Sequence, residues 1–299
     1  MKKTILSLAI MAFAMCMNNC SNDIESAGTS SQYITVSTGI GSMTRVSTDA
    51  NGSQTFTAGD QISIYAWTGD SAKAPAASYR VVDNAINTLG TDGQWTAAPQ
   101  MLWKNTTDHH YFIGIYPKTE TSVADLSAGD YTLDVNKQKQ SDLLVATNLE
   151  GLTSKDHPVF LNFNHVMAKL TVNLMFRNQW GGTPTVESVT LKGVATNAKV
   201  NYLTQTLTAG TTTGDISLPA TTANETYTSI IIPQKGVKSI VVKIDGEDYT
   251  YTNTNKDGIK LESGKITSIN LIVGRNKIDE TAVNINDWET KDLETGEAQ

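Results

Sequence analysis

Short runs of alternating apolar and polar residues, interrupted by turn-forming residues, constrain the fold of this chain more than any other feature. Turn signals recur roughly every ten residues, and the β-branched residues Thr and Val are frequent between them. Helical periodicity is weak, and we expect no more than one or two helical turns, around Ser141–Thr147. The pattern therefore predicts an all-β protein. The clearest strands are expected at residues 33–38, 61–67, 111–116, 166–176, 239–244, 247–252, 266–273 and 282–288.

One hairpin can be predicted in detail. Asp245 and Gly246 stand between two alternating runs, residues 239–244 and 247–252. A two-residue loop of this composition favours a type I′ turn, because glycine adopts the required positive φ without strain. We therefore expect these two runs to pair as neighbouring antiparallel strands.

The N-terminus has the pattern of an export signal. Lys2 and Lys3 precede an almost wholly apolar run, Ile5–Met17, after which the sequence turns polar. Such a run is too short to span a bilayer comfortably and is typical of a secretory signal peptide. We predict a signal peptide over residues 1–19 that is removed just before Cys20.

Cys20 is the predicted lipidation site. The chain has two cysteines, Cys16 within the apolar run and Cys20 at its end. Cleavage before Cys20 leaves one cysteine for acylation, and each buried acyl CH₂ contributes about 0.8 kcal/mol to membrane binding. The mature chain then has no second cysteine for a disulfide, so its stability must come from core packing and strand pairing. The alternative is an ordinary signal peptide that is cut nearby.

The length of 299 residues suggests two domains of ordinary size. Residues 21–31 are small and polar, which is typical of a flexible tether. A composition change at residues 150–158 is typical of a linker. The predicted organisation is a lipidated tether with an N-terminal strand over residues 20–45, one β-sandwich over 46–155 and a second over 156–299.

The composition argues against nucleic-acid binding and against catalysis. The formal net charge is −7, the isoelectric point is near 5.1, and no Lys/Arg cluster is present. The chain has no nucleophile elbow, no zinc-protease motif and no complete dinucleotide-binding loop. We expect no enzyme activity and no cofactor.

Weak metal-binding candidates are outweighed by structural interpretations. His109 and His110 are adjacent before a strand, so their side chains would point to opposite faces and chelate a metal poorly. Residues 253–258 begin like a calcium loop but lack its acidic first position, and a connection between strands is favoured. His165 is interpreted as a structural histidine at the start of a core strand, because no partner His or Cys lies nearby in sequence.

Carbohydrate-related candidates are also weak. Trp67, Trp95 and Trp103 could form a sugar-stacking platform, although tryptophans of a β-sandwich more often belong to the core. Ser71, within Asp70-Ser71-Ala72, is a candidate acceptor for O-linked glycosylation.

Several short motifs follow one another along the chain, each of them weak alone. They are Thr44-Arg45, Phe56–Tyr65, Tyr111–Pro117, Ser141–Ala146, Phe163–Leu170, Ile231–Gln234, Gly264-Lys265 and Asp287-Trp288. In order and spacing they resemble the fimbrillin family of type V pilus subunits, with FNHVMAKL at Phe163–Leu170 as the most specific piece.

This resemblance implies two tandem transthyretin-like, Greek-key β-sandwiches that follow a lipoprotein signal peptide. It implies an outer-membrane precursor that assembles with sister and other pilus subunits into surface fimbriae and supports adhesion to a host or bacterial surface ligand. It also implies that an arginine-specific protease cuts between Arg45 and Val46, which releases the N-terminal strand and the lipid together.

A sandwich that lacks one strand exposes unpaired N–H and C=O groups that another extended chain can fill. Loss of the strand at residues 32–40 would leave such a groove. The last two strands are the candidate donors. The side chains expected to fill the groove are Ile269, Leu271, Val273, Val283 and Ile285. We therefore predict a pilus subunit that polymerises by donor-strand exchange; the alternative is a monomeric outer-membrane lipoprotein that binds glycans.

Overall fold

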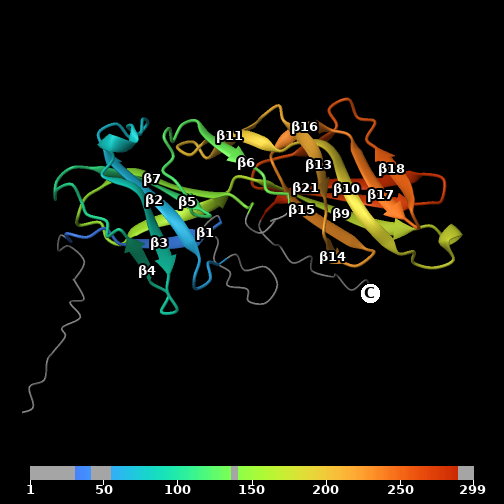
Figure 1. The fold of residues 1–299 in the computed structure, drawn as a ribbon, viewed down its shortest axis with the longest axis horizontal. Helices are drawn as coiled ribbons and strands as arrows, with labels where there is room; N and C mark the ends of the chain where they lie inside the picture. Colours follow the sequence, from blue (N-terminus) through green and yellow to red (C-terminus); the bar gives the residue numbers. More distant parts are fainter. Residues whose placement is uncertain (1–30, 42–54, 136–140, 289–299) are drawn as a thin grey trace, which may run out of the picture.

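The computed structural model describes residues 31–41, 55–135 and 141–288. Figure 1 shows an elongated molecule with two β-rich lobes, the first coloured blue to green and the second yellow to red. Helical structure in the described residues is limited to two single 3₁₀ turns, Ala77–Tyr79 and Asn178–Trp180. No helix in these ranges has both the length and the apolar character needed to cross a membrane. The prediction of an all-β fold is confirmed.

The first lobe is one sheet in the order β1-β8-β7-β5-β2-β3-β4. Its strands are β1 (Val36–Ile40), β2 (Gln61–Thr68), β3 (Val82–Leu89), β4 (Trp95–Ala98), β5 (His110–Tyr116), β7 (Leu144–Leu152) and β8 (Val159–His165). β1 runs parallel to β8, whereas the other neighbouring pairs are antiparallel. Although β1 and β4 lie at opposite ends of this order, Trp95 Nε1 of β4 donates a hydrogen bond to Thr38 Oγ1 of β1 at 3.0 Å. The sheet therefore curls until its two edges approach each other.

The second lobe has two sheets that share one core. The first has the order β13-β10-β17-β18 and the second β14-β15-β9-β20-β21, with a small β16-β19 pair beside them. Their strands are β9 (Ala168–Phe176), β10 (Val186–Ala195), β13 (Thr213–Ser217), β14 (Ala220–Thr222), β15 (Thr226–Ile231), β16 (Gln234–Val237), β17 (Ser239–Ile244), β18 (Glu247–Thr252), β19 (Ile259–Leu261), β20 (Lys265–Val273) and β21 (Ile278–Asp287). Alternate residues of β9, β17 and β20 are buried between the sheets, as period-two patterning requires.

A small sheet joins the lobes. β6 (Gly129–Thr132) from the first half pairs antiparallel with β11 (Asn197–Asn201) from the second, and β11 pairs with β12 (Thr206–Ala209). Figure 1 shows β6 and β11 side by side between the lobes. Because β6 is paired with β11 and Tyr202 packs against Gly129, the two lobes share a continuous core. Relative movement of the lobes would require breaking this pairing.

The prediction that rests on a few neighbouring residues agrees with the structure, and the one that depends on a distant strand does not. The hairpin is confirmed, since β17 and β18 flank Asp245 and Gly246, which both have positive φ angles of 53° and 79°. The helical turns expected at Ser141–Thr147 were wrong: Leu144 onward forms β7, because the apolar side chains on both of its faces are buried beside β5.

The junction between the lobes lies later than the linker suggested by composition. The sequence placed it at residues 155–156, but β8 still pairs with β1 and β7 of the first sheet. The chain passes to the second lobe between His165 and Ala168, where β9 begins. The polar residues 153–158 form the connection between β7 and β8.

Candidate assembly surfaces

The N-terminal strand lies at an edge of the first sheet. Residues 36–40 pair with β8 in a parallel register that runs from Val36 opposite Val159 to Ile40 opposite Phe163. Just before them, Ile34 N–H donates to the Met101 carbonyl at 3.0 Å. At each point along its length the strand is thus paired on one side only. Such a strand can be removed without breaking a ladder between other strands.

The inner face of this strand is apolar. Ile34 and Val36 are 1% and 6% exposed and belong to the core of the first lobe. Thr38 and Ile40 follow on the same face, beside an open groove of about 660 Å³ that Phe56 and Trp95 also line. Loss of the strand would extend this groove and expose the core beneath it.

Two tryptophans hold the strand through their ring nitrogens. Trp103 Nε1 donates to the Tyr33 carbonyl at 3.2 Å, and Trp95 Nε1 donates to Thr38 at 3.0 Å. Sequence reasoning missed these contacts, because nothing local indicates which strand a distant indole will reach. Trp67, by contrast, is fully buried on the other face of the sheet, with its Nε1 bonded to the Asp70 carbonyl at 2.8 Å.

The burial of the tryptophans bears on the sugar-platform interpretation. Trp67 is 0% exposed, Trp103 is 8% exposed and Trp95 is half-buried. Trp67 and Trp103 also belong to different core clusters. The preferred interpretation of Trp67 and Trp103 as core residues is confirmed.

The two candidate donor strands occupy different positions in the second lobe. β20 lies between β9 and β21 and is hydrogen-bonded on both sides. Its inward side chains Ile269, Leu271 and Val273 are all 0% exposed. β21 is the edge strand of this sheet, and its Val283 and Ile285 are 37% and 39% exposed.

A β-bulge shapes the face that β21 presents. Asn270 pairs with Ala282, but the next residue, Leu271, pairs with Glu280, so Thr281 is the extra residue. The insertion places Glu280 on the same face as Val283 and Ile285, because alternation is shifted by one at a bulge. These three side chains line a groove of about 680 Å³ between β21 and the segment from β18 to β19.

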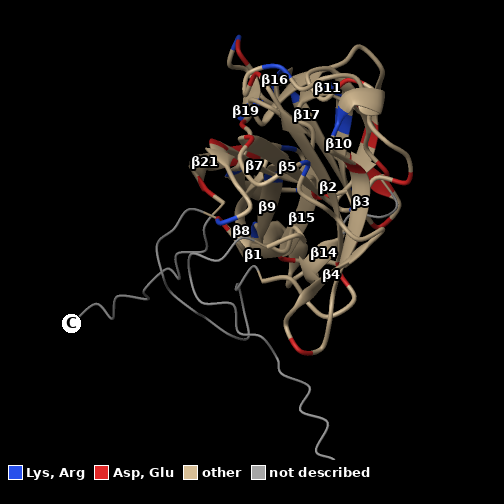
Figure 2. Ribbon diagram, turned by 90° about the vertical axis from the view of Figure 1, so that its left-hand side faces the viewer, with Lys and Arg blue, Asp and Glu red and all other residues tan. Residues whose placement is uncertain are grey.

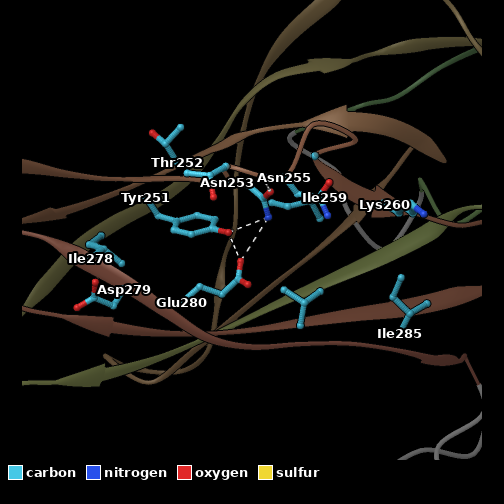
Figure 3. Close-up of a pocket in the computed structure, with 13 residues that line it drawn as sticks. Tyr251, Thr252, Asn253, Asn255, Ile259, Lys260, Ile278, Asp279, Glu280 and Ile285 are labelled. Atoms are coloured by element: carbon cyan, nitrogen blue, oxygen red, sulfur yellow. Dashed lines mark hydrogen bonds between the residues drawn. The ribbon is translucent and has the colours of Figure 1, made fainter.

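A polar contact crosses one end of that groove. Figure 3 shows the Tyr251 hydroxyl, the Asn253 amide and the Glu280 carboxylate pointing toward one another. Tyr251 Oη donates to Glu280 Oε2, and Asn253 Nδ2 donates to Tyr251 Oη at 2.9 Å. Burial and the adjacent Glu280 carboxylate raise the pKa of Tyr251 above its usual value. The phenol therefore stays a donor, and β21 is tied to β18 at this end.

The weak metal-binding candidates are occupied by structural contacts. His109 Nδ1 lies 2.6 Å from the Gly151 carbonyl, and the buried His110 ring contacts the Asp108 carbonyl and the Lys104 N–H. Within the described ranges, no three His, Cys, Asp or Glu side chains are grouped as a metal site would require.

The segment at residues 253–258 forms the connection between β18 and β19. Gly258 has a φ of +63°, and a Cβ at this position would lie 2.6 Å from the Val237 carbonyl oxygen, so glycine is required here.

Ser71, the candidate glycosylation acceptor, lies partly exposed in the turn after β2. Figure 2 shows acidic and basic residues at scattered positions along the ribbon of the described residues.

The remaining predicted sites lie outside the described residues. These are the lipidation site Cys20 and the cleavage site Arg45–Val46. Gly41 is the last described residue before that cleavage site, and its N–H donates to the Phe163 carbonyl at 2.8 Å. The described part of the N-terminal strand thus ends four residues before Arg45.

Comparison with protein families identifies the chain. A family model described as fimbrillin-like matches residues 44–288. The chain belongs to the fimbrillin-like family. Members of this family are structural fimbrial subunits rather than enzymes, so the chain is a pilus subunit of the cell surface that assembles with other subunits. The resemblance inferred from short motifs is confirmed.

Individual relatives of this fimbrillin-like chain come from Bacteroides. A Bacteroides uniformis protein named "Putative fimbrium subunit Fim1C" is 29% identical over 230 residues, which cover 71% of this chain and 70% of that protein. The solved structure of a "putative cell adhesion protein" from Bacteroides ovatus matches with a TM-score of 0.68 and 20% identity, over 87% of this chain and 99% of its own. Another, from Bacteroides uniformis, has a TM-score of 0.63 and 20% identity, over 79% and 94%. At these identities the solved structures show a shared fold.

Proposed function

We propose that this fimbrillin-like chain is exported as a lipoprotein through Cys20, loses its N-terminal strand by cleavage after Arg45, and polymerises by donor-strand exchange into fimbriae that support cell adhesion. Each lobe is then a transthyretin-like sandwich, and the first is made incomplete by the cleavage. The similarity to proteins named as fimbrium subunits and cell adhesion proteins supports this proposal.

The position of β1 is the observation that carries the proposal. The strand has an apolar inner face, is paired on one side only, and leads toward Arg45. Cleavage there would remove Ile34 and Val36 from the core and leave the edge of β8 unpaired. One extended strand from a second copy of the chain can fill the vacated core positions and also pair with the free edge of β8.

β21 is the proposed donor. Its one strand ladder is with β20, so its departure breaks a single ladder and some side-chain contacts, whereas the departure of β20 would break two ladders and remove Ile269, Leu271 and Val273 from the core. Full burial of an aliphatic side chain is worth about 1.5–3 kcal/mol. Val283 and Ile285 are more than one-third exposed in the resting position, so they gain burial in the groove of a neighbour.

The hydrogen-bond ladders do not oppose exchange. In the resting subunit β21 is bonded to β20, and in the polymer it would bond to β8 of the neighbour. Since each hydrogen bond contributes only about 0.5–1.5 kcal/mol net, the exchanged ladders nearly cancel. The net gain comes from covering the apolar groove that removal of β1 leaves open.

The test is assembly of an Arg45→Ala precursor. We expect a folded, membrane-bound monomer that forms no fibres by electron microscopy, because the N-terminal strand stays in place. Arg275→Ala is the matched control: Arg275 is an exposed arginine beside Trp180, and its loss should leave assembly unchanged. Normal fibres from Arg45→Ala would refute the cleavage step. Mass spectrometry of the mature N-terminus tests acylation of Cys20 separately.

A further inference from the structure

We propose that Trp288 anchors the end of β21 in its own domain, and that loss of β1 weakens this anchor through β8. The inference rests on the proposed donor role of β21. It adds a means by which one cleavage both opens the acceptor groove and frees the donor strand. We call the stack of Trp288 on His165, whose ring Asp142 orients, the Trp288 anchor.

Trp288 differs from the rest of the segment that it ends. Of the described residues 278–288, it is the one buried side chain, with 6% of its surface exposed. Burial of an indole removes far more apolar area from water than the part-exposed Val283 and Ile285 do. Release of β21 therefore depends strongly on release of Trp288.

The partner of the indole belongs to β8. The His165 ring stacks on Trp288 with a centroid distance of 4.3 Å and an interplanar angle of 6°. His165 Nδ1 lies 3.0 Å from Asp142 Oδ1, just before β7, which fixes the orientation of the imidazole. The Trp288 N–H donates to the Gly264 carbonyl at 3.0 Å. The end of the proposed donor strand is thus held by the strand that borders β1.

β8 is paired with β1 over most of its length, so its stability in the sheet depends on the presence of β1. β8 pairs with β1 at five successive positions, from Val159 to Phe163. Its ladder with β7 comprises two positions, Asn164 and His165. When β1 is removed, β8 keeps this short ladder beside His165 and one side-chain bond, from Asn148 Nδ2 of β7 to the Phe160 carbonyl at 3.3 Å. An edge strand held by so few bonds opens more often, and His165 moves with it.

The two ends of β21 are held differently. Near its start, Glu280 contacts Tyr251, and Asp279 pairs with Arg177. These partners lie in the second lobe and have no link to β1. Near its end, Asp287 pairs with Lys265 and Lys169 lies over the Trp288 ring, both in the second lobe, but the Trp288 anchor also reaches residues of the first lobe. Removal of β1 should therefore release β21 from its C-terminal end.

The first experiment tests the anchor in the uncut precursor, by hydrogen exchange measured with mass spectrometry. Trp288→Ala should speed exchange in residues 282–288 roughly tenfold or more, while β17 remains protected. Trp288→Phe keeps an aromatic ring against His165 and should retain most of the protection. Trp180→Ala is the control, because Trp180 packs at the opposite end of β20 and bonds the Val273 carbonyl.

Two outcomes would overturn the anchor. One is unchanged exchange of residues 282–288 in Trp288→Ala. The other is an equal loss of protection in β17 and β21, which would make Trp288 a general stability residue of the domain. Neither outcome depends on fibre formation, so the proposed function can fail or stand independently.

The second experiment tests the link to β1 without any protease. Val36→Thr should weaken the binding of β1 to the first lobe, because it buries a hydroxyl group in the apolar site that the Val36 side chain occupies. Val82→Thr makes the same change in β3, where Val82 is also 6% exposed in the same core cluster. We expect Val36→Thr to speed exchange in residues 282–288 several-fold and Val82→Thr to leave it unchanged. Equal effects of the two variants, or none from Val36→Thr, would refute the link through β8.

Discussion

Leu271 and Ile285 stand on the last two strands, and substituting each in turn separates the strand that builds the domain core from the strand proposed to leave it. Leu271 on β20 is fully buried, and Ile285 on β21 is 39% exposed in the groove of Figure 3. Leu271→Ala should weaken the folded monomer, whereas Ile285→Ser should weaken the joint between subunits.

The magnitudes follow from the burial of each side chain. Leu271→Ala leaves a cavity in a packed core, which costs about 2–5 kcal/mol of the free energy of unfolding. Ile285 keeps roughly three-fifths of its surface buried, so Ile285→Ser should cost the monomer about 1–2 kcal/mol. In a neighbour's groove the same side chain would be fully buried. Its loss there, together with burial of a hydroxyl, should weaken each joint by about 3–5 kcal/mol.

Urea unfolding of the uncut precursor, followed by tryptophan fluorescence, measures the first quantity. Resistance of the assembled fibres to urea, followed by native electrophoresis, measures the second. Asn284→Ser is the control, since Asn284 is exposed on β21 and does not line the groove. The reasoning is refuted if Ile285→Ser fibres resist urea as well as the wild type, or if Leu271→Ala weakens the fibres more than the monomer.

Three further predictions concern the first lobe. Gly114→Ala should destabilise it by about 1–3 kcal/mol in urea unfolding, because a Cβ would lie 2.6 Å from the Phe163 ring, and unchanged stability would contradict this packing. Burial lowers the pKa of His110, whose Nε2 accepts the Lys104 N–H, so stability should fall as the pH drops below about 6.5. His110→Gln should flatten that fall, and an unchanged pH profile would contradict the assignment. Arg80→Ala should cost about 3–5 kcal/mol by calorimetry, since the side chain is 1% exposed and bonds a carboxylate and three carbonyl groups; a loss below 1 kcal/mol would show that these bonds are dispensable.

Features encoded by neighbouring residues were predictable. The turn at Asp245-Gly246 follows from the conformational freedom of glycine, and the alternation around Ile34 and Val36 correctly placed both on one face, which the structure shows to be buried. The helical turns predicted at Ser141–Thr147 failed because a run of apolar residues suits a helix or a doubly buried strand equally well. Pairing with β5 decides between them, and that partner is about thirty residues away along the chain.

The sequence by itself determined that this chain is all-β and that its motifs are those of a fimbrillin-like subunit, and it predicts an export signal at the N-terminus. Only the tertiary structure decided that β20 is central and β21 is at the edge, although both have alternating apolar residues. It also brought Asp142, His165 and Trp288 together from three separate motifs. Alternation specifies which side chains face a core, but the order of strands in a sheet depends on contacts between residues far apart in the chain.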